Sequence, residues 1–157
     1  KASSGKTSSI TITPEVDWQP VAILDEWVSG GITSHLLVSV VEAAGSVVWL
    51  VKVEGELIAR LDGVDACFVG ARIAWLTRKD SQTWVSTADM PTSSQAGARL
   101  IGQQSVADGV ERLLGIPGST SMLFWGSRLA EGPLRFAEAS SPAVTLPISG
   151  PKHLIDS

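Results

Sequence analysis

The chain has 157 residues, with 12 basic and 16 acidic side chains and a formal net charge of −4. A single domain of ordinary size is expected for this length. Hydrophobic residues make up 44% and charged residues only 18%, which excludes disorder for most of the chain. The acidic balance also speaks against tight nucleic-acid binding by the isolated chain, although it leaves local RNA contacts inside a larger particle open.

The two ends of the chain differ in composition from its middle. Residues 1–13 are small and polar and then alternate, which predicts a flexible segment that leads into an edge strand. Residues 150–157 follow a proline-rich stretch and are expected to form a tail. We therefore predict one folded domain over residues 14–149.

A first helix is predicted near the start of this domain. Pro20 suits the first turn of a helix, where its missing N–H group needs no partner. Four apolar residues then recur at helical spacing: Val21, Leu24, Trp27 and Val28. Because Gly30-Gly31 ends the run, we expect an amphipathic helix over residues 20–29.

The middle of the chain is dense in β-branched residues and is divided by short loops that contain Gly or polar residues. The predicted strands are 36–41, 47–53, 57–61, 64–69, 73–77 and 83–87. Strands joined by turns this short run antiparallel, because parallel strands need long crossover connections. The pattern therefore predicts an antiparallel meander.

A second helix is predicted over residues 106–114, where Ser105 is a favourable N-cap and Gly115 ends the apolar run. The last predicted strands are 122–125, 134–137 and 144–148. No internal repeat is visible in the sequence. The predicted fold class is α+β, with one antiparallel β-meander sheet and two short helices packed on it.

The sequence carries no motif for catalysis or metal binding that we recognise. Gly5-Lys6-Thr7 looks like the end of a phosphate-binding loop, but the earlier glycine, the strand and the helix of that motif are missing. His35 and His153 lie far apart, and no G-x-S-x-G or metal-ligand spacing is present. We therefore predict no catalytic residue, no metal site and no cofactor.

Two further groups have a simple structural interpretation. Cys67 stands in an apolar strand with nothing nearby to lower its pKa, which predicts a buried structural thiol rather than a nucleophile. Carboxylates such as Glu54, Glu56 and Asp62 fall in predicted turns. A facing pair could serve glycosidase chemistry, but solvated turn residues explain them as well.

Basic residues accompany tryptophans at the hairpin over residues 73–87 and again near residue 125. The candidate RNA-binding residues are Arg72, Arg78, Lys79, Arg128 and Arg135, and the candidate partner-interface residues are Trp75, Trp84 and Trp125. Arginine beside exposed aromatic rings binds single-stranded RNA through phosphate pairing and base stacking. In the alternative interpretation, the arginines extend over a core that buries the tryptophans.

Several short motifs occur together in one order along the chain. They are Glu26-Trp27, Val47-Val48-Trp49, Glu54-Gly55-Glu56-Leu57-Ile58, the hairpin Ile73-Ala74-Trp75 with Trp84, and Leu123-Phe124-Trp125-Gly126-Ser127. In this order the chain resembles the small accessory subunit family of type III-D CRISPR effector complexes, over about residues 26–148. In that family the Glu-Trp pair lies on a helix.

The resemblance implies a non-catalytic structural subunit of a cytoplasmic, RNA-guided ribonucleoprotein. Base pairing reads the target in such particles, while protein subunits hold the RNA by shape and charge. The implied partners are the other protein subunits of the complex, together with guide RNA and target RNA, reached indirectly or through a few Arg and Lys side chains.

Two alternatives remain open. The first is a secreted or periplasmic β-rich binding domain with a ligand groove, whose signal peptide has been removed before Lys1. The second is a small enzyme with an unrecognised carboxylate pair. No membrane span is expected, because the most apolar window, residues 36–51, is interrupted by Glu42 and Gly45 and is shorter than the roughly 20 residues that cross a bilayer.

Overall fold

The computed structural model describes residues 17–91, 100–106, 109–126, 134–138 and 144–145. Within these ranges the chain consists of β-strands and the turns that connect them. The strands are β1 (Trp18–Ser29), β2 (Ile32–Glu42), β3 (Gly45–Lys52), β4 (Leu57–Leu61), β5 (Asp65–Val69), β6 (Arg72–Lys79), β7 (Gln82–Asp89), β8 (Leu100–Val106), β9 (Arg112–Gly115), β10 (Ser121–Trp125), β11 (Leu134–Glu138) and β12 (Val144–Thr145).

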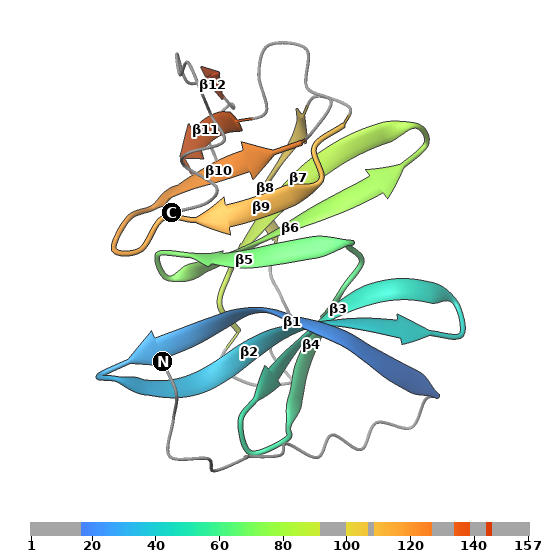
Figure 1. The fold of residues 1–157 in the computed structure, drawn as a ribbon, viewed down its shortest axis with the longest axis vertical. Coiled ribbons are helices and arrows are strands. Elements are labelled where there is room, and N and C mark those ends of the chain that lie inside the picture. The colour runs from blue at the N-terminus through green and yellow to red at the C-terminus, as the bar shows by residue number, and fades with distance from the viewer. Residues whose placement is uncertain (1–16, 92–99, 107–108, 127–133, 139–143, 146–157) are drawn as a thin grey trace.

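The strands form three four-stranded antiparallel sheets, β1–β4, β5–β8 and β9–β12, and each sheet follows the chain order. We call them blade 1, blade 2 and blade 3. Figure 1 shows the three blades lying one above another. We call β1, β5 and β9, the first strands of the three blades, the inner strands. They are neighbours, because β1 contacts β5 and β5 contacts β9. Blades of a β-propeller have this arrangement of four-stranded meanders.

The predicted α+β class is wrong, because neither predicted helix exists in the described residues. Residues 20–29 belong to β1, whose pairing with β2 is shifted at three places. Each β-bulge inserts an extra residue into a strand. Leu24 and Trp27 therefore pack against the same core cluster although they are three residues apart. A bulged strand thus has the apolar spacing that predicted a helix.

The second predicted helix, over residues 106–114, is wrong for a different reason. Val106 ends β8, residues 107–108 lie outside the described ranges, and Gly109 has a φ of 97°, which lies outside the helical region. Gly109 belongs to a turn that precedes β9. Val106, Val110 and Leu113 still share one core cluster, so their helical spacing reflects a turn that returns to the same core.

The antiparallel meander is confirmed, but it is divided among three sheets where the prediction had one. The predicted strand over Leu57–Leu61 coincides with β4, and the predicted strands near β2, β3, β5, β6, β7, β10 and β11 differ from them by a few residues at their ends. β8 is a further strand that the pattern does not predict. Only residues 144–145 of the last predicted strand are described, and residues 1–13 and 150–157 lie outside the described ranges.

The apolar core lies mainly between the blades. Successive side chains of a strand point to opposite faces of its sheet. Where consecutive residues are apolar, both faces of a blade are apolar, and each can be covered by a neighbouring blade. The cluster between blades 1 and 2 contains Leu37, Val48, Leu50, Ile58, Leu61, Ala66, Phe68 and Ile73. The cluster between blades 2 and 3 contains Cys67, Val69, Ala74, Leu76, Val85, Val106, Val110, Leu113, Met122 and Phe124.

Trp49 lies on the other face of blade 1, in a third cluster. Its ring is fully buried and lies 4.8 Å from the ring of Trp18. Its indole Nε1–H donates a 2.7 Å hydrogen bond to Glu42, which also accepts one from Arg60 Nε at 2.9 Å. A buried indole needs such a hydrogen-bond partner. Trp49, which belongs to the Val47-Val48-Trp49 motif of the resemblance, is therefore a core residue.

Two aspartates join the inner strands of neighbouring blades. Asp25 on β1 accepts a 2.8 Å hydrogen bond from the Phe68 N–H on β5. Asp65 on β5 accepts a 2.7 Å hydrogen bond from the Leu113 N–H on β9. Both aspartates lie four residues before the end of their strand. The same connection is therefore made twice, from blade 1 to blade 2 and from blade 2 to blade 3.

Candidate binding groove

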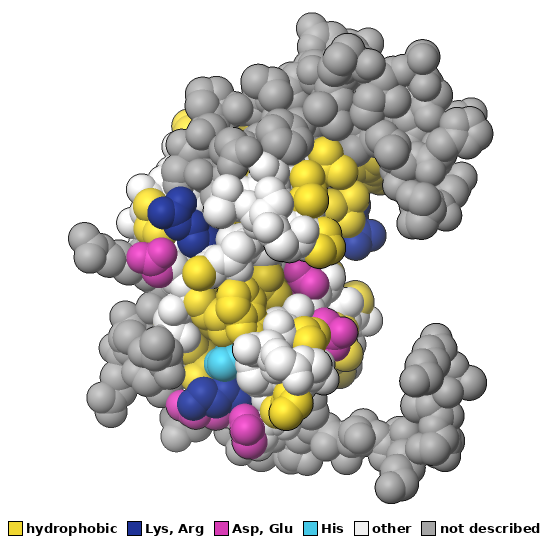
Figure 2. Space-filling view, turned by 90° about the vertical axis from the view of Figure 1, so that its left-hand side faces the viewer, with side chains coloured by type: hydrophobic (Ala, Val, Ile, Leu, Met, Phe, Trp, Pro, Cys, Tyr) yellow, Lys and Arg dark blue, Asp and Glu magenta, His cyan; other side chains and the backbone are white. Residues whose placement is uncertain are grey.

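A groove of about 470 Å³ crosses the edge of the molecule at which β1, β5 and β9 end. Its lining residues come from all three blades and are Asp25, Glu26, Trp27, Val28, Phe68, Gly70, Gly115, Ile116, Pro117 and Gly118. Figure 2 shows this side of the molecule, where hydrophobic side chains gather in the middle of the face with acidic side chains beside them. The volume lies within the usual range of ligand-binding clefts.

The wall formed by β1 is held in place by contacts with β5 on one side and with β2 on the other. Trp27 meets the ring of Phe68 edge-on, with 5.4 Å between ring centroids. Asp25 accepts the Phe68 N–H through one carboxylate oxygen and the Glu26 N–H through the other, both at 2.8 Å. The Thr33 hydroxyl donates to one oxygen of Glu26 at 3.2 Å. The Glu26 side chain remains exposed to solvent at the groove.

The opposite wall is built from the turns that follow β5 and β9, where Ile116 and Pro117 contribute side chains and the glycines contribute main chain alone. Gly70 has a φ of 57°, and a Cβ at this position would lie 3.3 Å from Thr120 Cγ2 in blade 3. Gly118 has a φ of 72°. Glycine adopts this left-handed conformation without steric cost. The turns of blades 2 and 3 can therefore lie close together and leave the groove open.

A second depression of about 310 Å³ lies beside the turn between β3 and β4, and Ser34, His35, Lys52, Glu54 and Glu56 line it. The Ser34 hydroxyl is 2.9 Å from His35 Nδ1, and Lys52 Nζ forms a 2.8 Å ion pair with Glu56. Burial, followed by the charge of Lys52, lowers the pKa of His35. A neutral imidazole is therefore favoured at pH 7.

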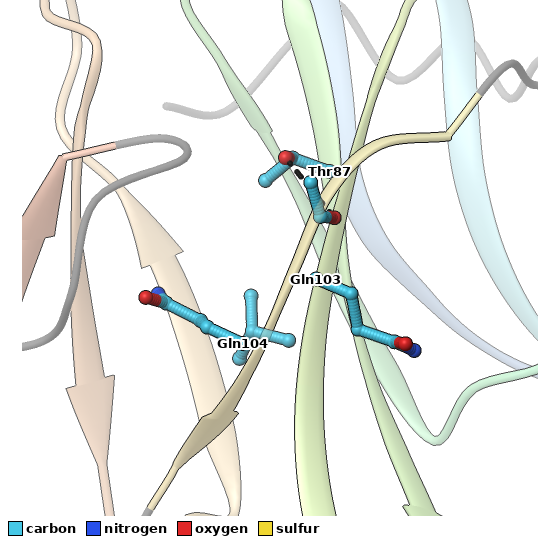
Figure 3. Close-up of a pocket in the computed structure, with 5 residues that line it drawn as sticks. Thr87, Gln103 and Gln104 are labelled. Carbon is cyan, nitrogen blue, oxygen red and sulfur yellow. Dashed lines mark hydrogen bonds between the residues drawn. The ribbon is translucent and has the colours of Figure 1, made fainter.

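A third hollow encloses only about 80 Å³ and lies over β7 and β8 (Figure 3). The Thr87 hydroxyl lies 3.5 Å from the Gly102 carbonyl oxygen to which it donates. Gln103 and Gln104 point to opposite sides of β8. A space of this size holds a few water molecules and is too small for a larger ligand.

The predicted basic residues of the hairpin do not form one patch. Arg72 begins β6 and Arg78 and Lys79 end it, which separates them by about 20 Å at the usual rise per strand residue. Arg72 Nε lies 3.7 Å from Asp89, and Arg78 donates to the Val110 carbonyl at 3.1 Å. Arg78 therefore connects blade 2 to the chain that enters β9.

The other predicted site residues lie in several places. Trp75 is partly buried against the core cluster between blades 1 and 2. Trp84 on β7 and Trp125 at the end of β10 are half-buried. Arg135 lies on β11 opposite Phe124, and its side chain is outside the described part, as is the whole of Arg128. For Trp75 the structure agrees with the alternative interpretation, a tryptophan that contributes to the core.

Sequence analysis missed the groove, because it assigned residues 20–29 to a helix. The sequence does contain a pattern that marks the strand ends at the groove. Asp25 and Asp65 are each followed, five residues later, by a glycine that turns the chain, Gly30 and Gly70. This spacing marks the end of an inner strand in blades 1 and 2, and these strand ends line the groove.

Cys67 and Asp65 are the buried titratable groups of β5. Cys67 is 2% exposed, which confirms the predicted structural thiol, and burial strongly raises the pKa of this thiol. Burial also raises the pKa of Asp65, and the Leu113 N–H and the Arg112 guanidinium at 3.3 Å oppose this shift. Neither side chain lines the groove.

Among the described residues, no three His, Cys, Asp or Glu side chains are placed to hold a metal ion. The described part also contains no long apolar helix of the kind that crosses a bilayer. Comparison of the chain with protein-family models, with curated proteins and with solved structures finds no significant match.

Proposed function

We propose that the chain is a non-catalytic binding module that holds a segment of a partner protein in the groove across its three blades. One observation carries this proposal: all three inner strands end at the same edge, and their ends and turns together line the groove. Residues on loops and strand ends of a rigid scaffold are the usual place for recognition. The blade architecture supplies that scaffold.

Membership of a type III-D CRISPR complex is one setting in which such a module would act. The partner segment would then belong to a neighbouring subunit. Glu26-Trp27, which the resemblance puts on a helix, lies on β1 and lines the groove. This motif therefore supports the binding proposal through its position in the groove, while its secondary structure departs from the family pattern.

A secreted or periplasmic β-rich binding domain is the second setting. The all-β architecture and the groove favour it, because a ligand groove in a β-rich scaffold is the feature that this alternative predicts. Both settings need the same surface. They differ in the partner and in the presence of RNA.

The test is recovery of the tagged full chain from its native host, with identification of bound protein by mass spectrometry and extraction of nucleic acid. Val28→Lys places a positive charge beside Glu26 in the groove, where Val28 is 50% exposed. Val21→Lys is the matched control on the same strand, since Val21 is 63% exposed and does not line the groove. We expect Val28→Lys to lose the partner and Val21→Lys to keep it.

Equal recovery of the partner by both variants would exclude the groove as the binding site. Short uniform RNA together with large CRISPR subunits would support the first setting. A partner protein recovered without RNA would support the second.

A further inference from the structure

We propose that the segment held in the groove is an extended, basic peptide that places a Lys or Arg side chain against Glu26 and rests apolar side chains on Trp27, Val28 and Phe68. This inference rests on the proposed function and names the chemistry of the partner.

The charge of the groove is the first support. Asp25 and Glu26 are the charged residues among those that line it, and both are acidic. The oxygens of Asp25 accept main-chain N–H groups of Glu26 and Phe68, so this carboxylate is already used. Glu26 accepts one hydrogen bond, from Thr33 to Oε2, which leaves Oε1 open to a cation from solvent. Charge complementarity of this kind selects a basic partner.

The apolar floor is the second support. Trp27 is half-buried and Val28 is 50% exposed, so both present apolar surface to the groove. Aromatic and apolar side chains that line a cleft beside a charged group provide contact area, while the charged group fixes orientation. An extended segment suits this pattern, since its alternate side chains can contact the acid and the apolar floor.

The low wall opposite is the third support. Gly70 and Gly118 contribute only main chain to the side of the groove formed by blades 2 and 3, between the side chains of Phe68, Ile116 and Pro117. The groove is therefore open at the two glycine positions. A peptide main chain fits such an opening, whereas a deep enclosed pocket would favour a compact small molecule.

The experiment measures fluorescence anisotropy of two labelled Gly/Ser peptides with the full chain. One peptide carries Leu and Arg side chains, and the matched peptide carries Leu and Glu at the same positions. Each is titrated against the wild type, Glu26→Gln and Glu54→Gln. Glu54 is an exposed acid outside the groove, so its loss controls for the general attraction between an acidic protein and a basic peptide.

We expect the Arg peptide to bind and the Glu peptide not to bind. Glu26→Gln should weaken binding about fivefold, as for loss of one exposed ion pair, and Glu54→Gln by less than about twofold. Circular dichroism of the variants checks that the sheets are retained. Equal weakening by the two substitutions, or equal binding of the two peptides, would overturn the inference.

The result separates this inference from the proposed function. If Val28→Lys abolishes partner recovery but the Arg peptide does not bind, the groove is the site and the basic peptide is wrong. If Val28→Lys leaves partner recovery intact, the proposed function is wrong whatever the peptides do.

Discussion

Asp65 shows how one side chain links two blades. It is 3% exposed, its carboxylate accepts the Leu113 N–H at 2.7 Å, and Arg112 Nε lies 3.3 Å away. Burial raises the pKa of this carboxyl above its ordinary value. The folded chain therefore binds a proton at Asp65 more readily than the unfolded chain does. Stability contributed by this proton is complete below the unfolded pKa and is lost as pH rises through the raised folded pKa.

Substitution of Asp65 should separate its hydrogen bond from its charge. Asp65→Ala leaves the buried Leu113 N–H without its acceptor and should lower the free energy of unfolding by about 1–3 kcal/mol at pH 7. Asp65→Asn keeps an acceptor oxygen and removes the buried charge, so it should lose less. Urea denaturation measures both, with Asp62→Ala as an exposed control expected to change stability by less than about 0.5 kcal/mol.

The pH dependence of the unfolding free energy tests whether the pKa of Asp65 is raised in the folded chain. The stability of the wild type relative to Asp65→Asn should fall as pH rises from below the unfolded pKa of an aspartate, about 3.9, to neutrality. A relative stability that rises with pH would show that the buried carboxylate is stabilised as an anion, against this account.

Cys67 should be inert in the folded protein. It is 2% exposed in the core between blades 2 and 3, and burial raises the pKa of its thiol. The thiolate is the reactive form, so a thiol reagent at pH 8 should label the chain only after denaturation in urea. Rapid labelling without denaturant would show that β5 opens to solvent.

At the scale of the element, Gly115 determines how closely β9 approaches β5. A Cβ at this position would overlap the Phe68 carbonyl oxygen. Gly115→Ala should therefore force the two inner strands apart and lower the free energy of unfolding by about 1–3 kcal/mol, the usual cost of overpacking. Leu114→Ala is the neighbouring control, since Leu114 is 38% exposed, and it should cost less. Thermal unfolding of the two variants gives the comparison, and equal losses would contradict the close approach.

The elements also show what the sequence could predict. Residues 57–61 lie between the turn at Glu54-Gly55-Glu56 and Asp62-Gly63, and these turn signals make their strand predictable. In β1, by contrast, the register shifts bring Leu24 and Trp27 to one core, and local spacing then imitates a helix. The role of Asp25 depends on Phe68, which is 43 residues further along the chain, so no local pattern reveals it.

At the scale of the whole molecule, the four-stranded antiparallel sheet is repeated three times, although the sequence shows no clear repeat. The shared features are few: each blade has a glycine in its first turn, and the inner strands of blades 1 and 2 each carry an aspartate four residues before their end. Loops of different length separate these features, which hides the period. The antiparallel order is predictable from short turns, whereas division into three sheets depends on which faces pack together.

The groove exists only because those three sheets stack. Its residues are spread from Asp25 to Gly118, and none of the predicted basic or tryptophan positions lines it. The central claim is therefore that recognition occurs at the edge shared by the inner strands rather than at the hairpin that carries Arg78 and Lys79.

The most direct test places a photo-crosslinking amino acid at Val28 or at Lys79 of the full chain in its native host. Both positions are exposed. Crosslinked products are identified by mass spectrometry and checked for nucleic acid. The account predicts that Val28 crosslinks to a defined basic segment of one partner protein and that Lys79 does not. Crosslinks from Lys79 to RNA or protein, with none from Val28, would contradict it.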